Sequence, residues 1–300
     1  MFRLIKLKSN YNFIGKRKPA IILSAFFMII SIISFTVQGL NWGIDFSSGY
    51  VVQLKFERNI AISEVRNTIE KNGVKDAIIQ SFGNNNEVLI KMKEESNFNK
   101  DSINDFLIKS FSETKPFQIV KMEFVGSQIG QELREKGEWA MLVALLSILV
   151  YIGFRFEFIY GVGAIVALIH DVVITLGFFS LFQIEFDLSV LSAILAVIGY
   201  SLNDTIVVYD RIRENTRVIK TNDYQSILNN SVNQTLSRTL ITSLTTMFVL
   251  FSLFLLGGPA VQLFALAMII GILIGTYSSI FIASTSLLLL GANAEIRETN

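Results

Sequence analysis

The residue best placed to do chemistry in this sequence is a carboxylic acid, Asp204, inside an apolar stretch from about Leu188 to Val208. That stretch is long enough to form a membrane-spanning helix. Ionisable side chains at membrane depth are costly and usually functional. The helical face that carries the acid must therefore look toward protein or water rather than lipid. At helical spacing this face comprises Val197, Ser201, Asp204, Val208 and Arg211.

Two interpretations of Asp204 follow. As a proton carrier, it would gain and lose a proton because loss of hydration disfavours the charged carboxylate. As a structural acid, it would be satisfied by a nearby hydroxyl or amide, and Ser201, Asn203 and Thr205 are close enough in sequence to offer one. The cost of an acid at this depth favours the proton carrier.

Arg238, followed by Thr239, begins another predicted span and is the candidate counter-charge. Asp204 lies about 10 Å inside the end of its own helix at 1.5 Å per residue, so the two depths can match. A nearby cation favours the ionised acid, and relative movement of the two helices would then switch the site between holding and releasing a proton. Spacing alone equally allows an arginine that only marks the membrane interface.

His170 and Asp171 lie near the middle of a further predicted span. As neighbours on a helix they should point about 100° apart, so the sequence does not predict a ready-made pair. A proton relay and an interhelical hydrogen bond by Asp171 both remain open. Asp171 shares its face with three small side chains that suit close helix packing, those of Gly163, Ala167 and Thr175.

The elements that must position these residues are membrane helices. The chain has 300 residues, of which 51% are hydrophobic and only 17% charged, which is typical of a polytopic membrane protein. Six spans are predicted, at residues 19–38, 139–155, 159–182, 188–210, 237–256 and 262–289. The second is shorter than the ~20 residues that a bilayer core requires and must borrow flanking residues.

The distribution of lysine and arginine predicts the orientation. The N-terminus is basic and the connection after the fourth span carries Arg211, Arg213 and Arg217, whereas the turns at 183–187 and 257–262 carry neither residue type. The positive-inside rule then places both termini in the cytoplasm. The expected division is a cytoplasmic N-terminus (1–18), a first span (19–38), a periplasmic domain (39–138), a bundle of five spans (139–290) and a cytoplasmic tail (291–300).

The predicted periplasmic domain is a small α+β unit. Alternating apolar residues predict strands at 50–56 and 120–124, and two more strands, 77–82 and 88–92, flank a turn at 83–86. With helices near 63–71 and 103–111, the order β-α-β-β-α-β is ferredoxin-like. The domain has no histidine or cysteine cluster and no nucleotide-binding loop. We therefore expect no metal, no cofactor and no catalysis here, but a unit that binds or braces something.

Several motifs resemble the SecF family of bacterial protein-export membrane proteins. The main one is Gly199–Asn215, with Asp204 inside it, and others follow in the same order along the chain. They are Gly43-Ile44-Asp45-Phe46, Val125-Gly126 with Gly130, Ser237–Ser243 and Gly257-Gly258-Pro259. Two departures are visible, since Ser47-Ser48-Gly49 stands where the family usually has a double glycine and Ser127 where a proline is usual.

The resemblance implies a subunit of the bacterial inner membrane whose architecture is half of an RND-type transporter bundle. Its partners would be SecD, the SecYEG translocon with associated membrane proteins, and translocating preproteins, with no nucleic acid. It would use the proton-motive force at a late stage of export and would not be an enzyme. The resemblance also favours Arg238 as the partner of Asp204.

The joints between the domain and the spans are expected to act as hinges. Glycines able to adopt unusual backbone angles lie on both sides, at Gly43 and Gly49 and at Gly126 and Gly130. Asp45 is interpreted as a helix cap, while the resemblance adds a gating role as the alternative.

Two other functions are compatible with a membrane-embedded acid and base. One is proton-coupled efflux of small molecules or lipids, although about a hundred external residues leave little room for a substrate path. The other is a structural scaffold for the translocon, which would tolerate an uncharged residue at position 204.

Overall fold

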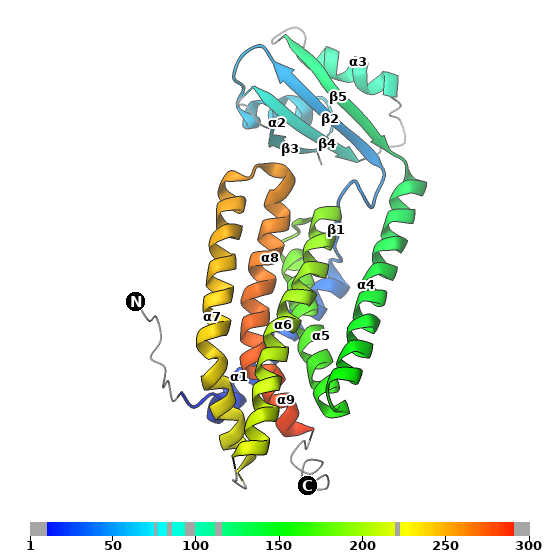
Figure 1. Cartoon of the computed structure of the whole chain (residues 1–300). Coiled ribbons are helices and arrows are strands. Elements are labelled where there is room, and N and C mark those ends of the chain that lie inside the picture. The colour runs from blue at the N-terminus through cyan, green and yellow to red at the C-terminus, as the bar shows by residue number, and fades with distance from the viewer. Residues whose placement is uncertain are drawn as a thin grey trace.

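The computed structural model describes residues 11–74, 77–82, 86–93, 100–111, 116–219 and 223–290. Figure 1 shows two parts, a bundle of long helices and a small sheet with two helices at one end of it. Residues 83–85 of the predicted turn lie outside the described residues.

Six helical segments are long and apolar enough to cross a membrane, as the sequence predicts. Their helices are α1 (Arg17–Val37), α4 (Ser127–Arg155), α5 (Phe158–Leu181), α6 (Leu188–Val218), α7 (Tyr224–Leu256) and α8 (Pro259–Ser278). α8 continues through a π-helical turn, η2 (Ser279–Ala283), into α9 (Ser284–Leu289). α4 begins well before residue 139, which supplies the flanking residues that the short second span needed.

The centre of the bundle is formed by α5, α6 and the last span. About half of the most apolar window of each is buried (50%, 56% and 56%), against 22% for the first span and 11% for α4. The side chains that could do chemistry are therefore concentrated on helices that face protein.

Small residues allow these central helices to approach closely. A Cβ atom at Gly271 of α8 would collide with Val197 of α6, and one at Gly275 would lie 2.9 Å from the Cβ atom of Ser201. The small-residue face of α5 is packed equally closely, because a Cβ atom at Gly163 would collide with the side chains of Tyr209 and Ser286. The close packing predicted for the small-residue face of α5 is confirmed at Gly163.

The four-stranded sheet has the ferredoxin-like topology that the sequence predicts. Along the chain its elements are β2 (Gly49–Phe56), α2 (Ile62–Lys71), β3 (Ile78–Ser81), β4 (Glu87–Lys93), α3 (Lys100–Phe111) and β5 (Phe117–Val125). The strands lie in the order β3-β4-β2-β5, and every neighbouring pair is antiparallel. Alternate residues of β2 and β4, such as Val52, Leu54 and Ile90, are buried in a core with Val65 and Leu107 of the helices.

A second, two-stranded sheet was not predicted. β1 (Asn41–Trp42), just after α1, pairs in parallel with β6 (Glu185–Phe186), which lies in the turn between α5 and α6. The rings of Trp42, Phe46 and Phe186 pack together with centroids 5.4–5.8 Å apart. This ladder fastens the start of the external segment to the end of the bundle.

Candidate functional site

Asp204 is buried in the bundle with only 3% of its surface exposed. The Arg238 guanidinium and the Ser243 hydroxyl, both from α7, interact with its carboxyl group. Oδ2 of the acid is buried and has no hydrogen-bond partner among the described residues. A buried acid with an unused oxygen and a cation within electrostatic range is a group that can exist with or without a proton.

The three neighbours offered by the sequence do not satisfy this acid. Ser201 donates its hydroxyl hydrogen bond to Asp171, and Thr205 shares one with Ser279 at 3.1 Å. Asn203 is exposed on another face of α6. The interpretation of Asp204 as an acid satisfied by these residues is therefore wrong.

The cationic and the hydroxyl residue predicted on α7 lie in different environments. Arg238 is exposed on the surface of the bundle, whereas Thr239 is 1% exposed and its Oγ1 has no partner among the described residues. Ser243, one turn further along the helix, shares a hydrogen bond with Thr276 Oγ1 at 2.8 Å. Polar atoms of α7 therefore line the side of the bundle that faces α6 and α8.

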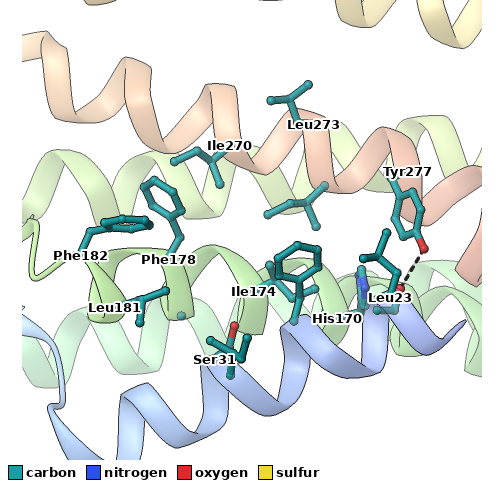
Figure 2. A pocket seen from close by; sticks show the side chains of 15 residues that line it. Leu23, Ser31, His170, Ile174, Phe178, Leu181, Phe182, Ile270, Leu273 and Tyr277 are labelled. Atoms are coloured by element: carbon teal, nitrogen blue, oxygen red, sulfur yellow. Dashed lines mark hydrogen bonds between the residues drawn. The ribbon is translucent and has the colours of Figure 1, made fainter. Parts of the chain in front are cut away.

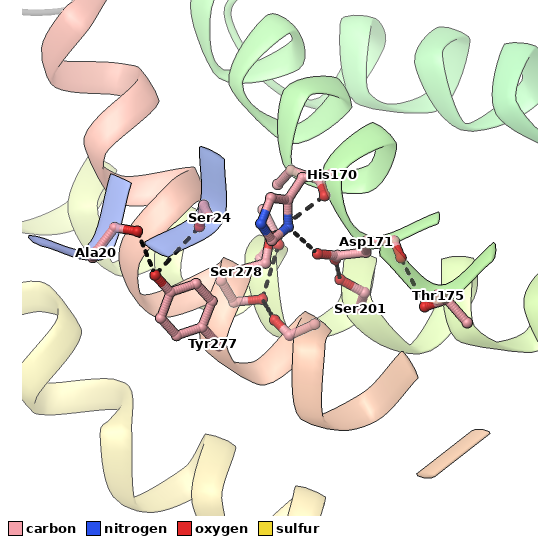
Figure 3. A network of polar contacts seen from close by, with 12 residues as sticks. Ala20, Ser24, His170, Asp171, Thr175, Ser201, Tyr277 and Ser278 are labelled. Atoms are coloured by element: carbon pink, nitrogen blue, oxygen red, sulfur yellow. Dashed lines mark hydrogen bonds and ion pairs between the residues drawn. The ribbon is translucent and has the colours of Figure 1, made fainter. Parts of the chain in front are cut away.

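His170 and Asp171 form a pair, contrary to the prediction from their adjacent positions. Nδ1 of His170 lies 2.9 Å from Oδ1 of Asp171, and Oδ2 of Asp171 accepts a 2.5 Å hydrogen bond from Ser201 (Figure 3). Adjacent Cβ atoms diverge, but rotation about the side-chain bonds of both residues brings the ring and the carboxyl group together. Asp171 thus makes the predicted interhelical hydrogen bond as well.

Sequence reasoning missed three participants in this polar layer, Ser243, Tyr277 and Ser279. Tyr277 of α8 donates to the carbonyl oxygen of Ala20 at 2.7 Å and accepts from Ser24 at 3.3 Å. The available signal was that serine, threonine and tyrosine recur in the apolar segments of α7 and α8, where each hydroxyl needs a partner.

An apolar cavity of about 590 Å³ lies beside this layer, between α1, α5 and α8. Figure 2 shows Phe178, Leu181 and Phe182 at one end of it and His170 with Tyr277 at the other. The described residues contain no group of histidines and carboxylates that could hold a metal ion.

The glycines expected to act as hinges have ordinary backbone angles. Positive φ near this joint is found at Gly39 (φ 68°) instead. A Cβ atom at Gly43 would meet Glu185 Oε1 at 3.0 Å, one at Gly49 would meet the backbone of β4, and one at Gly130 would meet the Ser47 carbonyl oxygen at 2.7 Å. Gly126 is the residue directly before α4. Gly43, Gly49 and Gly130 therefore allow close packing rather than strained turns.

Asp45 is a cap, in agreement with its default interpretation, but of a distant helix. Its Oδ2 accepts a 3.1 Å hydrogen bond from the backbone amide of Leu188, the first residue of α6. Nearby, Lys91 of β4 forms a 2.9 Å ion pair with Glu185, whose side chain is 5% exposed. The sheet domain and the bundle are thus joined by a largely buried charge pair.

Comparison with known families gives two matches. Residues 107–293 match the family described as protein export membrane protein SecD/SecF, C-terminal. Residues 33–60 match the SecD/SecF GG motif, even though Ser47 and Ser48 occupy part of it.

Curated relatives and solved structures agree with these matches. The protein translocase subunit SecF of Vibrio alginolyticus is 41% identical over 98% of this chain and 94% of its own length. The SecF subunit of Magnetococcus marinus is 48% identical over 94% of this chain and 92% of its own.

Among solved structures, the crystal structure of SecDF, a translocon-associated membrane protein from Thermus thermophilus, matches 95% of this chain with a TM-score of 0.81 and 36% identity. A SecDF structure in a super-membrane-facing form matches with a TM-score of 0.74 and 35% identity. The chain spans 39% and 41% of those two SecDF chains.

Proposed function

The chain belongs to the SecD/SecF family of protein-export membrane proteins, and from this premise we propose that it is a SecF-type subunit of the Sec protein translocase. With SecD, it uses the proton-motive force to promote late-stage preprotein export at the SecYEG translocon. The role is transport across the inner membrane and involves no enzymatic reaction. The observation that carries the proposal is the buried Asp204 carboxyl opposite Arg238 and Ser243 of α7.

The physical mechanism follows from competition between two effects. Burial disfavours the carboxylate, whereas the guanidinium of Arg238 favours it. A change in the distance between α6 and α7 alters that balance, so proton uptake from one side and release to the other become linked to helix movement. The unpartnered Oδ2 is the atom available to take the proton.

The test is replacement of Asp204 by asparagine, which keeps the shape and removes the titratable group. In membranes carrying the partner subunits, we expect Asp204→Asn to insert normally and to lose proton-dependent stimulation of export. Asp105→Asn, the same change at an exposed position of α3, is the matched control and should export normally. Normal late-stage export by the Asp204 variant would show that this acid carries no proton.

The proposed orientation places both ends of the chain in the cytoplasm and residues 39–138 in the periplasm. In its support, α1 begins and α9 ends at the end of the bundle opposite the sheet (Figure 1). Arg211, Arg213 and Arg217 lie at the last turns of α6, at that same end.

The exposed face of α6 is the surface proposed for SecD. In the middle of the helix its exposed side chains are small or carry an amide, at Ser192, Ala196, Gly199 and Asn203. A Cβ atom added at Gly199 would meet no atom within 4 Å, and an exposed asparagine at membrane depth needs a polar partner. Proton-coupled efflux, the alternative function, is not favoured, because the relatives described above are named as translocase subunits.

A further inference from the structure

The mechanism proposed for Asp204 leaves a second buried ionisable pair unused. His170 is 5% exposed and Asp171 is 1% exposed, both near the middle of α5. Ionisable groups at this depth are costly unless they serve a function. The pair also connects helices, because Asp171 accepts its hydrogen bond from Ser201 of α6 while the His170 ring stacks on Tyr277 of α8 at 6.3 Å between centroids.

The hydrogen bonds determine where the protons lie when Asp171 is ionised. Its Oδ2 accepts from Ser201 and its Oδ1 lies 2.9 Å from Nδ1 of His170, so Nδ1 must carry the hydrogen. Nε2 is then a free lone pair. It is buried and has no hydrogen-bond partner among the described residues. In Figure 3 the ring lies between Asp171 on one side and Tyr277 with Ser24 on the other.

The titratable and charged groups around this ring are few. α5 contributes Asp171 itself, and α8 contributes Tyr277. α6 contributes Asp204, one turn beyond Ser201, with Arg238 of α7 beside it. The membrane-embedded part of α1 carries no charged side chain, nor does that of α4, and η2 and α9 contain none. Within the part of the chain that the structure describes, the pair therefore has no nearby cation of its own.

We propose that His170 and Asp171 together form a second proton-binding site of the bundle, which takes up its proton at Nε2 of His170. An N–H bond forms at Nε2, and the net charge of the pair changes from −1 to 0. The hydrogen on Nδ1 can then pass to Oδ1 of Asp171, which leaves a neutral imidazole and a carboxylic acid. Release reverses both steps. The neutral form is the less costly one at membrane depth.

The site would communicate with Asp204 through α6. Ser201 donates to Asp171 and lies one turn before Asp204 on the same buried face. Loss of charge on Asp171 weakens that charge-assisted hydrogen bond and frees α6 to move. This role rests on the proposed function, whereas proton binding by the pair can be measured without any export assay.

The sequence makes a direct measurement possible, because it contains a single histidine. The probe is the full chain labelled with ¹⁵N-histidine in lipid bilayers, observed by solid-state NMR over a range of pH. We expect the form with hydrogen on Nδ1 alone at high pH and a second hydrogen on Nε2 as the pH falls. Asp171→Asn should move the midpoint of that change by at least about one pH unit, and Asp105→Asn should not.

Two further variants keep the outcome clear. Ser201→Ala removes one hydrogen bond and leaves both titratable groups, so it should move the midpoint less than Asp171→Asn does. It is the variant to measure if Asp171→Asn does not fold. Asp204→Asn should leave the ring able to gain its second proton, whatever it does to export. Hydrogen on Nε2 alone at high pH, or a midpoint that neither Asp171→Asn nor Ser201→Ala alters, would overturn the proposal.

Discussion

At the scale of single residues, the proposed mechanism depends on a cation that solvent or a partner can reach. Arg238 is exposed, while the acid on which it acts is 3% exposed. An arginine at a bundle surface can move without disturbing the core, and its planar guanidinium can hold a carboxylate with two parallel hydrogen bonds. In the proposed mechanism, movement of Arg238 changes the charge state of Asp204.

Replacement of Arg238 should show how much of this effect needs the guanidinium. We expect Arg238→Lys, which keeps the charge and loses the planar fork, to reduce proton-dependent export, and Arg238→Met to reduce it further. Export driven from membranes with an imposed proton gradient measures both. Full activity of the methionine variant would mean that Asp204 works without this partner.

At the scale of helices, the glycines of α8 set the distance to α6 and hence the position of both proposed proton sites. A methyl group at position 275 would lie 2.9 Å from the Cβ and Oγ atoms of Ser201. Since Ser201 also holds Asp171, a shift at this contact affects packing and the polar layer together.

We therefore expect Gly275→Ala to destabilise the folded bundle by about 1–3 kcal/mol, the usual cost of overfilling a packed core. Gly153→Ala is the matched control, because that helical glycine of α4 has nothing within 4 Å of the added atom. The control should be neutral or stabilising by up to about 1 kcal/mol. Thermal unfolding in one detergent compares them, and equal melting temperatures would contradict the proposed packing.

At the scale of the whole molecule, the sheet domain is held to the bundle at several points. β5 ends at Val125 and α4 begins at Ser127, so a single residue separates them. The Lys91–Glu185 ion pair joins β4 to the turn between α5 and α6, and the β1–β6 ladder fastens the segment that leads into β2 to the same turn. If helix movement drives preprotein movement, these contacts must either break or pass the movement of the helices on to the sheet domain.

A reversible crosslink tests whether the domain moves against the bundle. Cysteines at positions 91 and 185, in a chain that has none, can be joined by a short bifunctional thiol reagent that a reductant removes. We expect the crosslink to stop export and reductant to restore it. Cysteines at 55 and 87, the site of an ion pair within the sheet, are the control and should not affect export when joined. Unimpaired export with the first crosslink complete would identify the domain as a static platform.

The exposed face of α6 allows a second test at this scale. We expect Gly199→Leu to leave the chain folded and to reduce its co-purification with SecD by a large factor, because leucine fills the space that a partner helix would use. Gly153→Leu makes the same change at an exposed glycine of α4 and should leave co-purification intact. Equal yields of SecD with both variants would exclude this face of α6.

The sequence by itself determined the six spans and the four strands of the larger sheet. Hydropathy located the six spans, because a helix that crosses lipid needs a long apolar segment. Alternation of apolar and polar residues indicated strands, because a sheet that buries one face places every second side chain in the core. The burial of Asp204 and the close packing at Gly163 were predictable for the same reason, since each depends on one helix face. These features are local, and the residues that specify them are neighbours in sequence.

Only the tertiary structure decided which polar atoms meet. The hydroxyl of Ser201 reaches Asp171 rather than Asp204, and His170 turns toward its own neighbour. Asp45 caps a helix that begins at Leu188, and Glu185 pairs with Lys91. Such contacts depend on the rotation of each helix about its axis and on side-chain torsions. Several partners have similar spacing in sequence, so these choices are settled only when all the helices and the sheet are packed together.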